Sequence, residues 1–409
     1  MNNMKSIELF AGAGGLALGA ALAGFEPLAV IEWDKWACDT IRENQERQNP
    51  LVVDWPLYEN DVRLFDFSGI PGKVDLVAGG PPCQPFSLGG KHKAYCDKRD
   101  MFPATIEVIR QLRPKAFVLE NVKGLTRTTF ANYFQYTLLQ LTFPELTISK
   151  NETWLQHLSR LEKEKTSGKA QGLTYDVVHR VVNAADYGVP QRRERIFIVG
   201  FRHDLSVRWS FPEATHSYDA LLYSQYISGE YWDKHKISRT ERAPISSPSA
   251  AKRIEKLRSG ALFAQESGKP WATVRDALQG LADPRDKDAA LRHFNHVFQD
   301  GARIYQGHTG SPLDLPAKTL KAGGHGVPGG ENMLVMPSGE TRYFTVRESA
   351  RLQAFPDTYV FHGSWTETMR QLGNAVPVTL ARIVLGSVAE KLIGTEFKKL
   401  VQHNTGTAL

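Results

Sequence analysis

Cys83 lies in a loop whose composition suits a reactive thiol. Residues 79–87 read Gly-Gly-Pro-Pro-Cys-Gln-Pro-Phe-Ser and follow the apolar run 74–78. That run predicts a buried strand, and the glycines and prolines mark its carboxyl end, where α/β sheets place their ligands. Prolines on both sides of Cys83 restrict the backbone and hold the side chain in a fixed direction. A cysteine that only fills a core needs no such restraint, so we interpret Cys83 as a positioned nucleophile.

Glu120 is a candidate general acid near this loop. The apolar run 116–119 predicts the next strand, which therefore ends in Glu120, Asn121 and Val122. The carboxyl ends of these two strands share one edge of the sheet, so Glu120 and Cys83 are expected on the same side. A carboxyl group there can transfer a proton, although it could instead cap the following turn.

An arginine cluster follows later in the chain. Residues 187–195 read Tyr-Gly-Val-Pro-Gln-Arg-Arg-Glu-Arg and separate two predicted hairpin strands, 175–182 and 195–200. Guanidinium groups bind carboxylates and phosphates through paired hydrogen bonds. A solvated basic turn is the ordinary alternative, and the residues alone do not decide between the two.

A glycine-rich turn near the start of the chain predicts a cofactor site. Gly12, Gly14 and Ala17 match the pattern G-x-G-x-x-G/A between a predicted strand, 5–10, and a predicted helix. Glu32 ends a second predicted strand about 20 residues later, where a carboxylate can accept both hydroxyls of a ribose. Together these features favour an adenosine-containing cofactor.

Two further side chains could complete that site. Trp33 could stack on an adenine, or it could simply pack at the end of its strand. Asp61 lies before the Cys83 strand, in a position suited to an exocyclic amine, although loop aspartates are usually just exposed.

The elements that must position these residues alternate between strands and helices. The first 200 residues predict an α/β domain with a doubly wound sheet, carrying a charged surface helix within 151–172. From residue 201 to about 339 the periodicity weakens and Gly, Pro, Ser and aromatic residues accumulate, which predicts a second, loop-rich domain. Thr345 and Glu348 then form a predicted capping box, and an apolar helix follows residues 371–377.

Composition limits the function without identifying it. The 409 residues include 50 Lys and Arg against 44 Asp and Glu, a net charge of +6 that is compatible with a polyanionic partner. Three cysteines without a CxxC spacing argue against a disulfide framework and a zinc site, and we expect no bound metal. No apolar run approaches the roughly 18 residues of a membrane helix and no signal peptide is evident, so we expect a cytoplasmic protein without membrane contact.

The order of these motifs resembles the cytosine carbon-5 DNA methyltransferase family. The resemblance is carried by FAGAGG (10–15), GGPPCQPFS (79–87), ENV (120–122), QRRER (191–195), RESARLQAFPD (347–357) and QLGNAVP (371–377). It spans the chain except for its middle region. It implies a Rossmann-like, doubly wound methyltransferase domain formed by residues 1–200 and completed by 366–409, with a target-recognition domain and hinge inserted at 201–365.

The resemblance also implies roles for individual residues. Cys83, Glu120, Arg193 and Arg195 would be catalytic, with the Cys83 thiolate adding to carbon 6 of a flipped cytosine. S-adenosylmethionine would be the methyl donor and S-adenosylhomocysteine the product. The expected donor contacts are Phe10, Gly12, Gly14, Glu32, Trp33, Asp61, Pro82, Asn374 and Val376, and the expected DNA contacts are Gln84, Ser87, Arg192, Thr319 and Leu320.

The expected partner is double-stranded DNA, bound by a monomer near the nucleoid of a prokaryote and paired functionally with a restriction endonuclease. A nicotinamide-dependent oxidoreductase would share the glycine turn and Glu32, but it would not explain the Cys83 loop or the arginine cluster. A tRNA-methylating member of the same family would be expected to carry a Cys-Phe-Thr tripeptide in its recognition domain. The chain has no cysteine after Cys96. A binding protein that had lost catalysis is disfavoured because Cys83, Glu120, Arg193 and Arg195 are all present.

Overall fold

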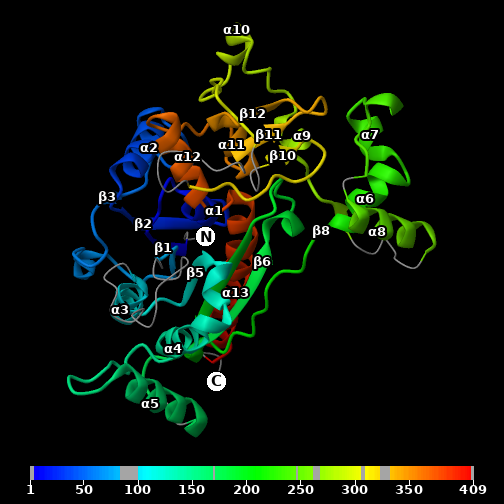
Figure 1. Cartoon of the computed structure of the whole chain (residues 1–409). Coiled ribbons are helices and arrows are strands. Elements are labelled where there is room, and N and C mark those ends of the chain that lie inside the picture. Colours follow the sequence, from blue (N-terminus) through cyan, green and yellow to red (C-terminus); the bar gives the residue numbers. More distant parts are fainter. Residues whose placement is uncertain are drawn as a thin grey trace.

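A seven-stranded sheet forms the centre of the computed structural model, which describes residues 4–82, 100–168, 171–245, 247–260, 268–304, 309–322 and 332–406 (Figure 1). The strands lie in the order β3-β2-β1-β4-β5-β7-β6. β1 to β5 are parallel, whereas β7 runs antiparallel to both β5 and β6. Their bounds are β1 (Met4–Leu9), β2 (Phe25–Glu32), β3 (Leu57–Glu59), β4 (Leu76–Gly79), β5 (Ala116–Val122), β6 (Tyr175–Asn183) and β7 (Glu194–Arg202).

Helices cover both faces of this sheet, as the sequence predicted. One face packs on α1 (Gly15–Leu22) and α13 (Val378–Gly406), and the other packs on α3 (Phe102–Leu112) and α4 (Ala131–Thr142). α2 (Lys35–Glu46) joins a third apolar cluster with α11 (Val346–Leu352) and α12 (Trp365–Asn374). The chain leaves β1 toward β2 on one side and returns to β4 on the other. The carboxyl end of β1 is therefore a switch point, where ligands bind in such sheets.

The last long helix returns to the first one. α13 packs along α1, and a β-carbon added at Gly19 would collide with Ala381. Because α13 packs so closely on α1, its contact face consists of apolar residues, which explains why they are frequent in this part of the sequence. By length and hydropathy, the stretch Trp365–Thr395 is sufficient to cross a membrane, contrary to the sequence-based expectation. However, 67% of that window is buried inside the protein, as expected for a core helix.

Three local predictions from the sequence are confirmed. β6 and β7 form the expected antiparallel hairpin. The charged segment contains α5 (Trp154–Ser167), which begins with a capping box between Thr153 and Gln156. Thr345 and Glu348 form the predicted capping box of α11.

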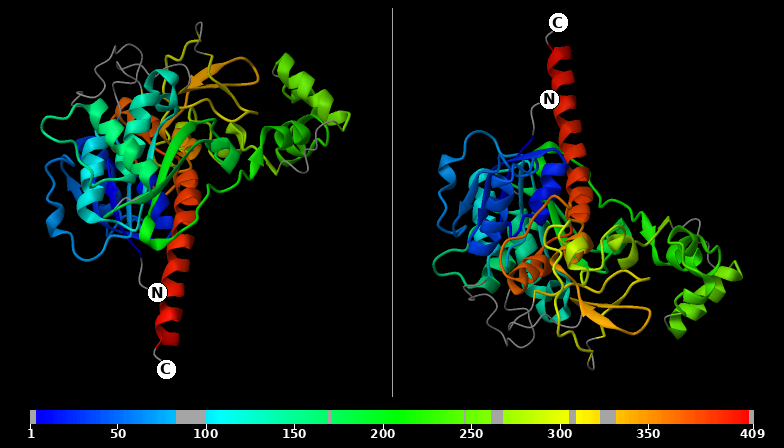
Figure 2. Two further views of the ribbon diagram at one scale, coloured as in Figure 1. Left: turned by 90° about the horizontal axis from the view of Figure 1, so that it is seen from below. Right: turned by 90° about the horizontal axis from the view of Figure 1, so that it is seen from above.

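The region after β7 contains more helix than its loop-rich composition suggested. Its elements are β8 (His216–Ser217), α6 (Tyr218–Tyr226), α7 (Glu230–Lys234), α8 (Pro248–Arg258), β9 (Lys269–Pro270), α9 (Val274–Leu278), α10 (Lys287–Ala290), β10 (Ser311–Pro312), β11 (Met333–Val335) and β12 (Thr341–Tyr343). Helices α6, α7 and α8 form an extension that projects from the body of the molecule in both views of Figure 2. β8 and β9 pair with each other beside α6, whereas α9, β10, β11 and β12 lie next to α11 (Figure 1).

Candidate active site at the carboxyl edge of the sheet

Neighbouring strand ends bring the predicted catalytic and cofactor segments to one edge. Leu9 of β1 pairs with Gly79 of β4, and Gly79 pairs with Leu119 of β5. The glycine turn, the loop after β4 and Glu120 therefore begin at the same level of the sheet. Cys83, Gln84 and Ser87 lie outside the described residues, but Pro82, which directly precedes Cys83, is placed at this edge.

Glu120 and Arg195 form a buried ion pair. Nε of Arg195 lies 2.9 Å from Oε1 of Glu120, and the two side chains are only 12% and 9% exposed. Burial raises the pKa of Glu120 above its usual value, although Arg195 and Arg193 oppose this rise. The guanidinium stays charged because arginine is effectively always protonated in proteins. The site thus combines a fixed positive charge with a carboxyl group whose pKa is raised by burial.

The start of the Cys83 loop passes directly over this pair. A β-carbon at Gly80 would lie 3.3 Å from Oε2 of Glu120, so glycine allows the backbone to approach the carboxyl group. The Asn121 side-chain amide donates to the carbonyl of Pro81 at 2.9 Å. On the other side of the loop, the Met101 amide donates to the carbonyl of Pro82 at 3.2 Å. These bonds fix both ends of the loop that carries Cys83.

Sequence reasoning assigned no role to Asn121. Its side chain is buried, and it joins the end of β5 to the loop after β4. The only available signal was its position directly after Glu120, because the contact with Pro81 joins residues 40 positions apart.

The arginine cluster lies against the segment that contains Thr319 and Leu320. The Arg192 amide donates to Ala317, and the Thr319 hydroxyl donates to the Arg192 carbonyl at 2.7 Å. The Arg192 side chain is exposed. Leu320 is buried in an apolar cluster, so its side chain faces the protein interior.

Arg193 differs from its neighbours because it is completely buried. Its guanidinium donates to the carbonyl oxygens of Leu320 and Gly373, at 3.0 and 2.6 Å. Its donors therefore point to backbone groups, whereas Arg195 faces the Glu120 carboxyl group.

The glycine turn is tied to Glu32. The Gly12 amide donates to Oε2 of Glu32 at 2.7 Å, while the amides of Trp33 and Asp34 donate to Oε1. Burial raises the pKa of Glu32, although these backbone donors oppose the rise. Oε2 retains capacity for another hydrogen bond, since a carboxylate oxygen has two acceptor positions.

The surroundings of this turn suit an adenosine-containing ligand. Space is open where a Gly12 side chain would lie, and the Trp33 ring is 70% exposed. Phe10 adopts a positive φ of 52°, an uncommon conformation for a residue other than glycine, and Gly14 is left-handed at 89°. These residues fit the predicted donor: a carboxylate for the ribose, a flat exposed ring and an open glycine turn.

The remaining predicted cofactor residues lie around the same turn or beside it. A β-carbon at Gly15 would collide with the carbonyl of Val376, so the start of α1 contacts the chain just after α12 directly. Asn374, at the end of α12, is exposed. Asp61 follows Asn60, whose amide donates to the Glu32 carbonyl, but the Asp61 carboxylate is held by Arg63.

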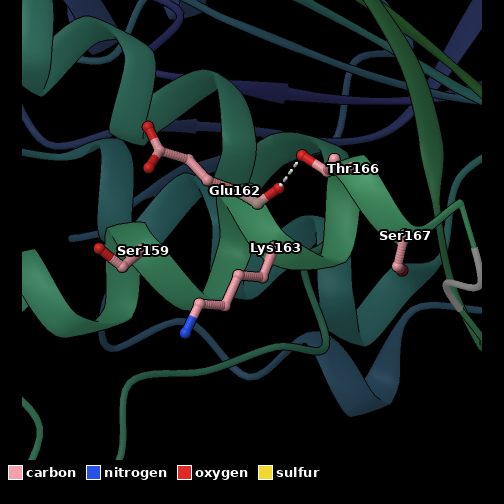
Figure 3. A pocket seen from close by; sticks show the side chains of 5 residues that line it. All are labelled: Ser159, Glu162, Lys163, Thr166 and Ser167. Atoms are coloured by element: carbon pink, nitrogen blue, oxygen red, sulfur yellow. Dashed lines mark hydrogen bonds between the residues drawn. The ribbon is translucent and has the colours of Figure 1, made fainter.

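A surface depression elsewhere offers no comparable chemistry. Figure 3 shows that its lining residues all come from α5: Ser159, Glu162, Lys163, Thr166 and Ser167. The Thr166 hydroxyl donates to the backbone carbonyl of Glu162 at 2.8 Å. Within the described ranges, no cluster of three or more His, Cys, Asp or Glu could hold a metal ion.

Comparison with known proteins places the chain in a family. The family described as "C-5 cytosine-specific DNA methylase" matches residues 4–145 and 153–390. The Type II methyltransferase M.NgoMIV of Neisseria gonorrhoeae is 30% identical over 384 residues, covering 93% of this chain and 95% of its own. M.PspPI of Psychrobacter sp. (strain TA137) is 29% identical over 403 residues, covering 97% of this chain and 81% of its own.

Solved structures share the fold. A putative DNA modification methyltransferase from a prophage of E. coli superposes with a TM-score of 0.56 at 22% identity, over 95% of this chain and 99% of its own. The S. pombe Dnmt2 methyltransferase gives a TM-score of 0.53 at 16% identity, over 96% and 99% of the two chains. The chain therefore belongs to the C-5 cytosine-specific DNA methylase family, and it is a DNA (cytosine-5-)-methyltransferase of the bacterial restriction-modification type.

Proposed function

We propose that this enzyme methylates a cytosine flipped out of a specific duplex sequence, through a covalent bond between Cys83 and carbon 6 of the base. The buried Glu120–Arg195 pair beneath the start of the Cys83 loop is the observation that carries this proposal. It supplies a proton donor and a fixed cation next to the position from which the thiol must act.

Covalent addition is needed because carbon 5 of cytosine is a poor nucleophile and cannot attack a methyl group unaided. The Cys83 thiolate forms a bond to carbon 6, and the electrons of the carbon 5–carbon 6 double bond move toward ring nitrogen 3. Glu120 in its protonated form delivers a proton to that nitrogen, which leaves an enamine with a nucleophilic carbon 5. Arg195 holds the Glu120 carboxyl group in place, and its charge favours the thiolate.

S-adenosylmethionine, when bound, supplies a methyl group activated by a sulfonium, and it leaves as S-adenosylhomocysteine. The residues proposed to hold it are Phe10, Gly12, Gly14, Glu32, Trp33, Asp61, Pro82, Asn374 and Val376. Glu32 and Trp33 would orient the adenosine through the ribose and the adenine. After methylation a base removes the carbon 5 proton, the Cys83–carbon 6 bond breaks with its electrons returning to sulfur as thiolate, and ring nitrogen 3 returns its proton to Glu120.

The target base must leave the helix, since its reacting atoms are inaccessible within a duplex. We propose that the region 201–365 reads the sequence, with Arg192 and Thr319 at its junction with the catalytic domain. Gln84 and Ser87 would contact DNA from the Cys83 loop, and Leu320 through its backbone. We also infer that the enzyme acts as a cytoplasmic monomer and protects DNA from a partner endonuclease.

The decisive experiment compares duplex DNA with tRNA as acceptors of a labelled methyl group from S-adenosylmethionine. Transfer to carbon 5 of cytosine in duplex DNA is expected, with label concentrated in one short sequence. Transfer to tRNA alone would contradict the proposal.

A further inference from the structure

The side chain of Arg193 joins two segments that are far apart in the sequence. Nη1 donates to the carbonyl of Leu320, 127 residues later, and Nη2 donates to the carbonyl of Gly373, 180 residues later. Leu320 belongs to the proposed recognition segment. Gly373 directly precedes Asn374, one of the proposed donor contacts. One guanidinium therefore touches the backbone next to both binding sites.

These two segments are also in direct contact. A β-carbon at Gly373 would collide with the backbone of Lys321 and Ala322, so only glycine permits this approach. Asn332 fixes Lys321 from the opposite side, because its side chain accepts from the Lys321 amide and donates to the Lys321 carbonyl. Displacement of residues 320–322 would therefore press on the last turn of α12.

The loop that carries Arg193 is itself fastened to the recognition segment. The Ala317 amide donates to Pro190, the Arg192 amide donates to Ala317, and the Leu320 amide donates to the Gln191 side chain at 3.1 Å. The position of the Leu320 carbonyl is thus set by several bonds to the same loop.

The chemistry at this junction requires arginine rather than a generic cation. The planar guanidinium can bind two carbonyls in different directions, whereas a lysine ammonium is a compact point charge without that fork. Burial and the neighbouring Arg195 lower the pKa of Arg193, and Glu120 opposes this change. Nε of Arg193 has no hydrogen-bond partner within the described part of the chain. Leaving this buried donor without a partner costs free energy.

We propose that Arg193 is a positioning residue that couples recognition of the DNA sequence to binding of the methyl donor. It does so by holding the backbones of Leu320 and Gly373 in one arrangement, without contacting the cytosine. This inference rests on the proposed function, since it takes residues 319–320 as DNA contacts and Asn374 as a donor contact. It differs from the sequence-based expectation that Arg193 is catalytic together with Arg195, which the same experiments also test.

The test measures a coupling between two binding events. Bisulfite sequencing of a plasmid grown with the wild-type enzyme first identifies the target. Calorimetry then measures the affinity for S-adenosylhomocysteine with a target duplex and with a scrambled duplex of the same length. In the wild type the target duplex should tighten binding by a factor of about 5 to 150, the usual range for coupled sites. In Arg193→Lys this ratio should fall close to one.

Two further variants separate coupling from general damage. Gly373→Ala keeps Arg193 but forces residues 321–322 away from α12. The ratio of the two affinities should therefore fall close to one in this variant as well. Glu194→Gln changes the exposed residue directly after Arg193, whose carboxylate pairs with Lys123, and should keep the wild-type ratio.

Each result has a defined meaning. If the wild type methylates no DNA or fails to bind S-adenosylhomocysteine, the proposed function itself is wrong. If the wild type functions but shows no coupling, or if Arg193→Lys retains it, only the role of Arg193 is overturned. If neither Arg193→Lys nor Gly373→Ala folds, as judged by circular dichroism, Arg193 belongs to the folding core and the inference is also overturned.

Discussion

Glu120 and Arg195 are paired across adjacent antiparallel strands, with 2.9 Å between Oε1 and Nε, although both side chains are largely removed from solvent. Such a pair is costly to bury and strongly destabilising to break. The pair lies at the edge where the Cys83 loop begins, and we propose that its carboxyl group is the proton donor of the reaction.

Replacing Glu120 by glutamine should slow the chemical step and leave the affinity for the donor unchanged. The amide cannot deliver a proton to ring nitrogen 3, and general acid catalysis typically contributes a factor of about 10² to 10⁴. Single-turnover kinetics measure this step. Glu194→Gln is the matched control, since Glu194 is an exposed carboxylate at the start of β7, the strand next to β5, and pairs with Lys123. Equal single-turnover rates for Glu120→Gln and the wild type would exclude Glu120 as the acid.

The raised pKa of Glu120 also predicts how the single-turnover rate depends on pH in the alkaline range. Burial raises the pKa of Glu120, and the acid is active only when protonated. The single-turnover rate should therefore fall as the pH rises through this elevated pKa. In Glu120→Gln that decline should disappear, and its persistence would assign the decline to another group.

Cys83→Ser should abolish methylation while duplex DNA still binds, because the substitution removes the nucleophile with little change in volume. The variant should also fail to form a covalent adduct with DNA containing 5-fluorocytosine, detected as a shifted band under denaturing conditions. Cys38→Ser is the control, since burial and nearby carboxylates raise the pKa of Cys38 to about 12 and keep it a thiol. An adduct in Cys83→Ser, or its loss in Cys38→Ser, would refute the assignment.

Glu32→Ala should weaken binding of S-adenosylhomocysteine by about 1 to 3 kcal/mol, because the ribose hydroxyls and the amides of Gly12, Trp33 and Asp34 lose their acceptor. Calorimetry gives the affinity, and the unfolding midpoint without ligand shows whether the turn survives. Unchanged affinity would mean that the ribose lies elsewhere.

Exchange of residues 201–339 for the matching segment of a relative should redirect methylation to the relative's sequence, because base-edge contacts carry specificity. The chimera must keep the backbone bonds between Ala317 and residues 190–192. Affinity for S-adenosylhomocysteine should not change. Bisulfite sequencing provides the readout, and methylation of the original site would place recognition outside this segment.

Glu8 should make stability depend on pH. Burial raises its pKa from 4.5 to about 7, although a hydrogen bond from Ser6 opposes the rise. Below pH 4.5 the group is protonated whether the chain is folded or not, so it costs nothing. Between pH 4.5 and 7 the unfolded chain ionises while the folded chain keeps the proton, so the penalty grows to about 3 kcal/mol, at about 1.4 kcal/mol per pKa unit, and it stays at that value above pH 7.

Glu8→Gln keeps an acceptor for Ser6 and should remove this penalty. Urea unfolding at pH 5 and pH 8 compares the two proteins. The variant should gain stability relative to the wild type only at the higher pH, and a gain independent of pH would show that ionisation of Glu8 is not the cause.

The sequence by itself determined the fold class and the order of the chemical motifs. Apolar runs ending in glycine, proline or an acid predicted β1, β2, β4 and β5, because strand ends and turns depend on residues only a few positions apart. The hairpin of β6 and β7 and the capping box of Thr345 followed from equally local rules. The roles of Cys83 and Glu32 remain predictions from sequence, supported by where their neighbours lie.

Only the tertiary structure decided how distant segments meet. Arg192, Arg193 and Arg195 look alike in sequence, yet one is exposed, one is buried against two backbones and one pairs with Glu120. The apolar stretch that could pass for a membrane span is core because it packs on α1. Such differences depend on contacts between residues 75 or more positions apart, which are set by packing and burial and leave no periodic signal in the chain.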